Sequence, residues 1–156
     1  MRFAACLLVV LASVAAGCGS SSKTSATTTK PDESNASESA ARFVVAVQAQ
    51  LKRGQFAKAW KTLHPAEQRV ISAQRLASCY PRDQFPGTVT FSARNARDVR
   101  WTVPGGETED AKEITIVATS SGQPKQTFTQ HVVRENGAWK WMLSSAYFKQ
   151  ARAGKC

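Results

Sequence analysis

Two histidines and one aspartate are the side chains of this 156-residue chain that could carry acid–base chemistry. His64 precedes a proline at the end of an expected helix, and His131 shares a strand face with Thr129 and Val133. A general acid or base must reach into a pocket with a pKa adjusted to its task. His64 in such a position ordinarily caps a helix or lies at the surface. If the protein is an enzyme instead, we expect it to use His64 or His131 together with Asp83.

Six further acidic side chains are poorly placed for catalysis, because they fall in expected turns, bends and helix ends. These are Glu67, Asp98, Glu107, Glu109, Asp110 and Glu135. The chain also has no Gly-rich phosphate loop, no Cys/His metal spacing and no Ser/His/Asp motif. We therefore expect no metal, no cofactor and no catalytic residues, and the sequence favours a non-enzymatic protein.

Aromatic side chains suggest a different kind of site. Four tryptophans stand on predicted apolar stripes: Trp60, Trp101, Trp139 and Trp141. They can simply fill the core. Alternatively, Trp60 and Trp101 line an apolar cavity together with Phe43 and His131, because pockets for small molecules are mostly aromatic and apolar with a few polar groups. Both interpretations remain open from the sequence.

Helices must come first along the folded chain. Apolar residues at helical spacing run from Ala40 to Leu51, after a cap at Ser37 or Ser39 and before Gly54. A second helix over 56–63 ends at His64-Pro65, because a residue before proline disfavours helix. Ser72 can cap a third, short helix that runs toward Cys79.

Strands must follow. Apolar residues alternate in 88–93, 99–103, 114–119, 128–133 and 139–143, with a bend or bulge at 95–98. Asn136-Gly137 is a strong hairpin signal. Helices followed by antiparallel hairpins indicate one α+β domain over residues 39–156, with N-terminal helices packed on a curved antiparallel sheet.

Two segments resemble a known superfamily. They are the helical pair Phe43–Leu63, with Gly54-Gln55-Phe56 at its centre, and the hairpin Arg134–Trp141. The chain is similar over roughly 39–145 to the nuclear transport factor two-like proteins, especially to their bacterial lipoprotein members. The resemblance implies a cone-shaped domain in which three helices fill the concave face of a bent sheet. The space between them is a catalytic pocket in some members and a plain binding or protein-contact surface in others.

The N-terminus has the features of an export signal. Arg2 precedes an apolar run over 3–16, which is too short to span a bilayer comfortably and suits a signal peptide. The run ends in Val14-Ala15-Ala16-Gly17-Cys18, which resembles a bacterial lipobox, although Ala15 stands where the motif usually has leucine. The resemblance implies a signal peptide over 1–17, a diacylglycerol on Cys18, and location at the extracytoplasmic face of the cell membrane. The Ser/Thr-rich segment 18–38 would be a flexible tether.

Two cysteines remain for the exported domain. Cys79 and Cys156 make an even pair, and disulfides persist in exported proteins. A disulfide between them would explain a cysteine at the end of the chain, whereas a nucleophilic thiol at Cys79 would leave Cys156 unexplained. We therefore predict a Cys79–Cys156 bridge.

The charge balance limits the kinds of partner that we expect this protein to bind. The chain has 21 Lys plus Arg against 11 Asp plus Glu, a net charge of +10, and the excess lies in the folded part. This charge favours anionic lipid or wall polymer as a partner, while export argues against nucleic acid. The predicted function is a lipid-anchored binding or interaction module for an apolar ligand, a lipid or a protein. The alternatives are an isomerase- or dehydratase-like enzyme of the same fold, and a structural subunit with a filled core.

Overall fold

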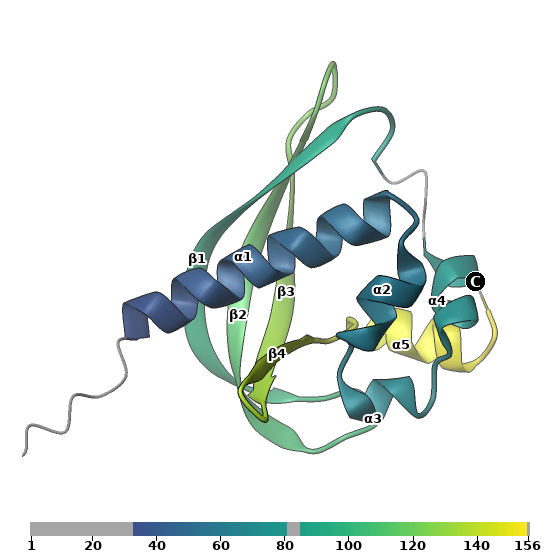
Figure 1. The fold of residues 1–156 in the computed structure, drawn as a ribbon. Helices are drawn as coiled ribbons and strands as arrows, with labels where there is room; N and C mark the ends of the chain where they lie inside the picture. The colour runs from purple at the N-terminus through teal and green to yellow at the C-terminus, as the bar shows by residue number, and fades with distance from the viewer. Residues whose placement is uncertain (1–32, 81–84, 156) are drawn as a thin grey trace, which may run out of the picture.

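The computed structural model describes residues 33–80 and 85–155. Its helices are α1 (Glu33–Lys52), α2 (Phe56–Lys61), α3 (Pro65–Gln68), α4 (Ala73–Cys79) and α5 (Ser145–Arg152). Its strands are β1 (Val89–Thr102), β2 (Thr108–Ser120), β3 (Gln126–Glu135) and β4 (Ala138–Trp141). Helix α1 crosses the sheet, and the shorter helices lie together near the C-terminal end of α1 (Figure 1). The predicted α+β class is confirmed.

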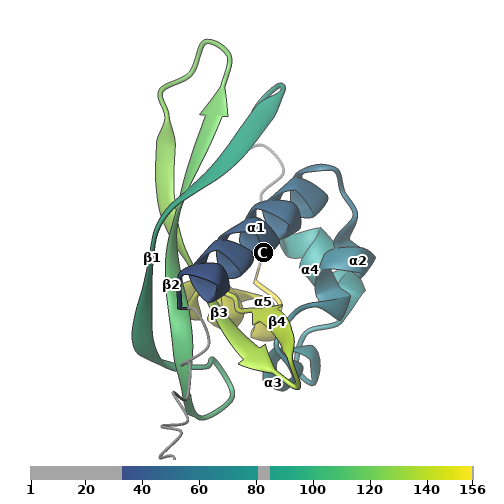
Figure 2. The ribbon, with the colours of Figure 1, turned by 60° about the vertical axis from the view of Figure 1, so that its left-hand side comes forward.

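The strands form one antiparallel sheet in the order β1-β2-β3-β4. Strands β1 and β2 pair along nearly their whole length, with a bulge between Arg94 and Ala96. Asn95 adopts a positive φ of 49° at that bulge, and bulges of this kind bend and twist a strand. The predicted irregularity at 95–98 is therefore real, but it lies inside one long strand. The resulting sheet is curved (Figure 2).

The main core lies between α1 and the concave face of the sheet. Ala40, Val44, Val47 and Leu51 form the predicted helical stripe, and all four are buried. They belong to the same cluster as the inward-facing strand residues Ile114, Ile116 and Val132. Burying each large aliphatic side chain stabilises the fold by about 1.5–3 kcal/mol, so this stripe holds α1 on the sheet.

A second, smaller cluster lies on the opposite face of the sheet. Val133 follows Val132 on β3 and therefore points the other way, where it joins Ala66, Val103, Ala111 and Met142. Gly106 closes the β1–β2 loop against this cluster. A Cβ at Gly106 would lie 3.1 Å from the Val103 Cβ and 3.2 Å from the Ala66 Cβ, so only glycine allows this close approach without displacement.

Several predicted boundaries are confirmed. The second helix stops before His64, as predicted, although it ends at Lys61 and not at residue 63. His64 is extended (φ −58°, ψ 136°) and precedes Pro65. Ser72 caps α4 by accepting a hydrogen bond from the Arg75 backbone N–H at 3.1 Å. Asn136 and Gly137, with φ of 49° and 80°, turn the chain between β3 and β4, as a two-residue hairpin requires.

Two boundary predictions are wrong. Helix α1 begins at Glu33, not after a cap at Ser37 or Ser39. Ser39 lies inside the helix, where its Oγ accepts a hydrogen bond from Trp139 Nε1 at 3.1 Å. The side chain that was expected to cap the helix therefore joins α1 to β4.

The last strand also differs from its prediction, because it ends at Trp141 and α5 follows. Ser144 caps α5 by accepting from the Tyr147 N–H at 3.2 Å. The alternating pattern of residues 139–143 suggested a longer strand, but Leu143 is instead held in a loop by a tertiary hydrogen bond that is described below.

Candidate functional site

A cavity of about 280 Å³ lies where the C-terminal half of α1, α4, α5 and the sheet meet. Strand β4 pairs only with residues 132–135 of β3, so residues 126–131 of β3 have no partner strand on that side. The cavity follows this open edge. For that reason side chains from both faces of β3, such as Gln130 and His131, contribute to its lining.

Six aromatic residues line the cavity. They are Tyr80, Phe85, Trp101, Phe128, Trp141 and Tyr147. Phe85 lies 6.0 Å from Phe128 between ring centroids and meets Phe91 edge to face at 5.5 Å. The Phe85 carbonyl accepts a hydrogen bond from Lys52 Nζ, which ties this part of the wall to the end of α1. Such a lining suits a flat or branched apolar molecule.

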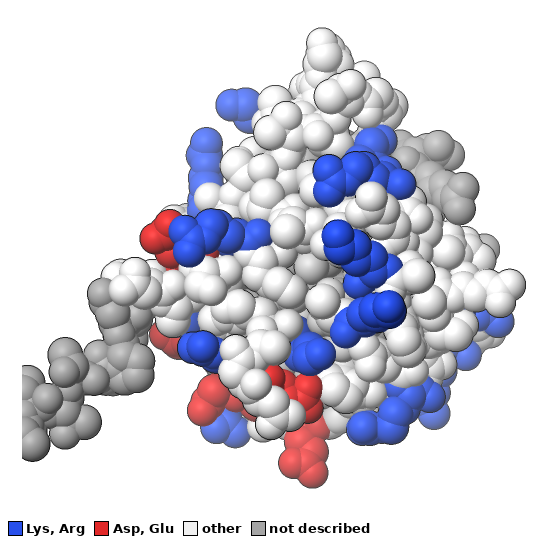
Figure 3. Space-filling view, viewed as in Figure 1, with Lys and Arg blue, Asp and Glu red and all other residues white. Residues whose placement is uncertain are grey.

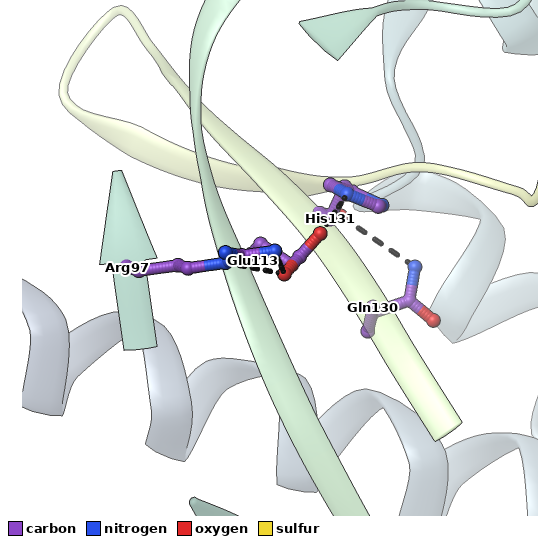
Figure 4. A network of polar contacts seen from close by, with 4 residues as sticks. All are labelled: Arg97, Glu113, Gln130 and His131. Atoms are coloured by element: carbon purple, nitrogen blue, oxygen red, sulfur yellow. Dashed lines mark hydrogen bonds and ion pairs between the residues drawn. The ribbon is translucent and has the colours of Figure 1, made fainter. Parts of the chain in front are cut away.

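Neutral amides supply the polar part of the inner wall. Gln48 on α1 donates from Nε2 to Gln130 Oε1 at 3.1 Å. Gln130 in turn donates to the Met142 carbonyl and, at 3.5 Å, to the His131 carbonyl (Figure 4). Both glutamines are buried, and their mutual hydrogen bonds remove the cost of burying them.

Two tyrosine hydroxyls stay protonated at the cavity. Burial raises the pKa of Tyr80 to about 12 and that of Tyr147 to about 12, with a smaller contribution to the latter from Tyr80. The Tyr147 hydroxyl donates to the Leu76 carbonyl at 3.3 Å. Neither the Tyr80 hydroxyl nor the buried Trp101 Nε1 makes a hydrogen bond with another described residue. The Trp101 nitrogen is fully buried, so of these two donors the Tyr80 hydroxyl is the one that an acceptor atom in the cavity could reach.

His131 is held by a chain of side chains across three strands. Its Nε2 lies 3.2 Å from Glu113 Oε2, and Arg97 Nε donates to Glu113 Oε1 at 2.6 Å (Figure 4). Trp101 stacks on the imidazole with ring centroids 3.5 Å apart and planes at 15°. The hydrogen bond from Arg97 lowers the pKa of Glu113, and burial lowers the pKa of His131 in spite of Glu113. These contacts favour a neutral imidazole whose Nε2–H donates a hydrogen bond to the Glu113 carboxylate.

The predicted pocket residues are only partly brought together. Trp101 and His131 both line the cavity, whereas its lining does not include Phe43 or Trp60. Phe43 packs half-buried against the main core. Trp60 donates from Nε1 to the Ile71 carbonyl at 2.6 Å, so its ring joins α2 to the chain before α4.

The alternative catalytic set does not assemble among the described residues. His64 is buried and caps α3, with Nδ1 accepting from the Ala66 N–H at 3.2 Å and Nε2 lying 3.3 Å from Glu109 Oε1. It does not contribute to the cavity lining. Asp83 lies outside the described residues. Of the three, His131 alone has been placed at the cavity.

Sequence reasoning missed the partner of His131. Glu113 stands directly opposite His131 in the β2–β3 register, and Arg97 stands directly opposite Glu113 in β1–β2. A signal for it existed, because a hairpin centred on Gly122 pairs residue 113 with residue 131. Residues opposite each other on antiparallel strands are close enough to interact, so Glu113 could have been found from the turn.

Sequence reasoning also missed a buried carboxyl group. Glu67 on α3 is fully buried, and its two oxygens accept from the Leu143 N–H at 3.0 and 3.2 Å. Burial raises the pKa of Glu67 to about 8, against a smaller lowering by the Leu143 hydrogen bond. Leu143 lines the cavity, so Glu67 positions one of its walls. Nothing in the local sequence distinguishes this glutamate from an exposed one.

Cys79 is disulfide-bonded at the end of α4. Its predicted partner Cys156 and the predicted lipidation site Cys18 lie outside the described residues, so both assignments stay predictions. Helix α5 lies beside α4 (Figure 1), where the Tyr147 hydroxyl reaches Leu76. The last helix therefore lies beside the helix that ends at Cys79.

Within residues 33–80 and 85–155, no group of three or more His, Cys, Asp or Glu side chains could hold a metal ion. No helix in this part of the chain is both long and apolar enough to cross a membrane. Comparison with protein-family models, curated proteins and solved structures finds no match.

Proposed function

We propose that this protein is a membrane-anchored, extracytoplasmic lipoprotein whose folded domain binds a small apolar ligand without catalysing a reaction. The aromatic cavity carries this proposal. Besides His131, its polar groups include paired glutamine amides and protonated tyrosines, which orient a ligand but do not transfer protons near neutral pH. The Tyr80 hydroxyl, which has no hydrogen-bond partner among the described residues, would suit an apolar molecule that carries a hydrogen-bond acceptor.

We also propose the nuclear transport factor two-like fold for this domain. A curved antiparallel sheet, helices on its concave face and a cavity between them support this assignment. The long α1 and the bulged β1 agree with the bent, cone-shaped sheet that the resemblance implies. The cavity favours ligand binding over a structural subunit with a filled core.

Lipidation of Cys18 is the basis for the proposed location. Expression in a bacterium should give a membrane-associated protein that begins at Cys18, because two long acyl chains anchor a protein stably. The variant Cys18→Ser should be released or remain as the unprocessed precursor, as seen by fractionation and N-terminal mass spectrometry. Processing and membrane location like those of the wild type would contradict the lipoprotein assignment.

Ligand binding can be tested with a neutral fluorescent probe, N-phenyl-1-naphthylamine. We expect saturable one-to-one binding with energy transfer from Trp101 and Trp141, which line the cavity. Phe128→Ala should weaken probe affinity about tenfold, because it removes an aromatic contact worth about 1–1.5 kcal/mol.

Phe43→Ala is the matched control. Phe43 and Phe128 are both half-buried against the main core, but only Phe128 belongs to the cavity lining. The control should therefore lose stability and keep probe affinity. Equal weakening in the two variants, or no saturable binding by the wild type, would contradict the proposed site.

The His131–Glu113 pair favours a second candidate, an isomerase- or dehydratase-like enzyme. Glu113 would hold the Nε2 proton, and Nδ1, which makes no hydrogen bond with a described residue, would accept a proton from a substrate. A general base must lie within about 3 Å of the atom it deprotonates. A crystal structure with a bound natural ligand decides between the candidates. A C–H or O–H group of the ligand against Nδ1 would favour the enzyme, and a ligand held by the Tyr80 hydroxyl away from Nδ1 would favour the binding module.

A further inference from the structure

The side of the molecule built by the short helices carries positive charge without compensation. Residues 52–80 and 145–155 contain nine Lys and Arg and a single acidic residue, Glu67. All nine except Lys52 are exposed, whereas Glu67 is fully buried. We call these nine side chains the basic helical face. Figure 3 shows blue groups without red neighbours on the right-hand side of the molecule, over α2 and its neighbours, whereas the red groups lie at the left and bottom, where blue groups are beside them.

The basic residues of the sheet are different, because several have acidic partners. Arg97 pairs with Glu113, Arg100 with Asp110 at 3.2 Å, and Lys112 with Asp98 at 2.8 Å. In contrast, no member of the basic helical face forms an ion pair within the described part of the chain. Charges with no partner in the fold are free to interact with an external anion.

An exposed apolar side chain lies within this face. Val70 is 44% exposed and is the one large hydrophobic residue among those described that is exposed to this degree. It follows Arg69 in the short connection between α3 and α4. An exposed apolar side chain next to a cation, on a side of the molecule with no exposed acidic residue, matches the anionic surface of a bilayer, where cations meet headgroups and a small apolar group enters the interface.

We infer that the basic helical face docks on an anionic lipid bilayer, with Val70 at the interface. Arg69, Lys58 and Lys61 meet the headgroup phosphates in this arrangement. The exposed valine distinguishes a bilayer from a soluble polyanion, which offers charge but no apolar layer. Docking holds the domain flat against the membrane instead of leaving it free at the end of its tether.

The test uses the chain from residue 19 onward. This chain lacks the apolar run and Cys18 but retains every buried core residue of the described part of the protein, since these lie between Ala40 and Ala151. Sedimentation with vesicles of phosphatidylglycerol and phosphatidylcholine in about equal amounts should show binding that declines with salt. Vesicles of phosphatidylcholine alone should bind much less. Because no lipid is attached to this chain, the result does not depend on the proposed lipidation or on the cavity.

Matched variants locate the surface. The triple variant Lys58→Gln, Lys61→Gln, Arg69→Gln should lose about a hundredfold in affinity, since each cation near an anionic surface contributes about fivefold. The control Arg94→Gln, Lys125→Gln, Arg134→Gln makes the same change in net charge on the sheet and its hairpins. The affinity of this control variant for the vesicles should fall less than tenfold. Equal losses in the two triple variants would overturn the assignment of the face.

Val70→Ser separates the bilayer from other polyanions. It should weaken vesicle binding about threefold with an unchanged salt dependence. Binding to soluble polyphosphate that is as tight as binding to vesicles, with no effect of Val70→Ser on either, would overturn the proposal and indicate a polyanionic polymer as the partner. Absence of binding to anionic vesicles at low salt would overturn it as well.

Discussion

Raising the pH from about 5 to about 9 should destabilise this protein through Glu67. The carboxyl group ionises in the unfolded chain near its ordinary pKa of 4.5, whereas burial in the fold raises that pKa to about 8. Between these values the unfolded state loses a proton that the folded state keeps. The free energy of unfolding should therefore fall as pH rises through this range and level off above pH 8. By linkage the loss is on the order of 4 kcal/mol.

The variant Glu67→Gln isolates this effect. Glutamine keeps an oxygen that can accept from the Leu143 N–H and carries no titratable proton. Urea denaturation across the pH range should show the difference between wild type and variant growing up to about pH 8. His131 and Glu113 act in the opposite direction, because lowered pKa values reduce stability as pH falls, and both remain in the variant.

Glu107→Gln is the control for Glu67. Glu107 is exposed in the β1–β2 loop, so its removal should leave the pH dependence of unfolding as in the wild type. If the free energy of unfolding depended on pH in the same way for wild type and Glu67→Gln, Glu67 would ionise in the folded protein near its ordinary pKa. The position of the Leu143 segment, and with it one cavity wall, would then need another explanation.

Loss of the Cys79 disulfide should have an effect of similar size. A bridge from Cys79 to Cys156 closes a loop of about 77 residues, and on the chain-entropy model such a loop stabilises the fold by around 4 kcal/mol. The position of α5 beside α4 fits this pairing. Cys79→Ala and Cys156→Ala should each lower the urea midpoint, and the core should still fold because its buried cluster spans all four strands.

A double variant tests whether the two cysteines are partners. If they form one bridge, Cys79→Ala with Cys156→Ala should be no less stable than either single variant. Mass spectrometry of non-reduced peptides should show the two linked. Additive losses, or recovery of a peptide that joins Cys79 to another cysteine, would contradict the predicted pairing.

Local patterns in the sequence were enough for most of the architecture. The stripe from Ala40 to Leu51, the break at His64-Pro65 and the Asn136-Gly137 turn each depend on a residue and its near neighbours. The physics is periodicity, a forbidden backbone region before proline, and the ease with which asparagine and glycine adopt positive φ. Such features act within a few residues, so they can be read without the fold.

The same reasoning failed where a distant segment competes with a local preference. Ser39 has the side chain of a good helix cap, but Trp139 takes it as a hydrogen-bond partner and the helix begins at Glu33. Leu143 continues an alternating strand pattern, but the Glu67 carboxyl group accepts a hydrogen bond from its N–H, and α5 begins two residues later. Tertiary hydrogen bonds decided both boundaries.

The site shows the same division. The sequence by itself determined that the domain is rich in aromatic residues, poor in obvious catalytic pairs and strongly basic. The tertiary structure decided that Trp101 and His131 meet at a cavity while Phe43 and Trp60 pack elsewhere. It also decided that Glu67 is buried. The physical reason is that burial and cavity lining depend on which surfaces come into contact when strands and helices far apart in the sequence pack together. Periodicity along the chain shows which face of an element is apolar, but not which other element will cover that face.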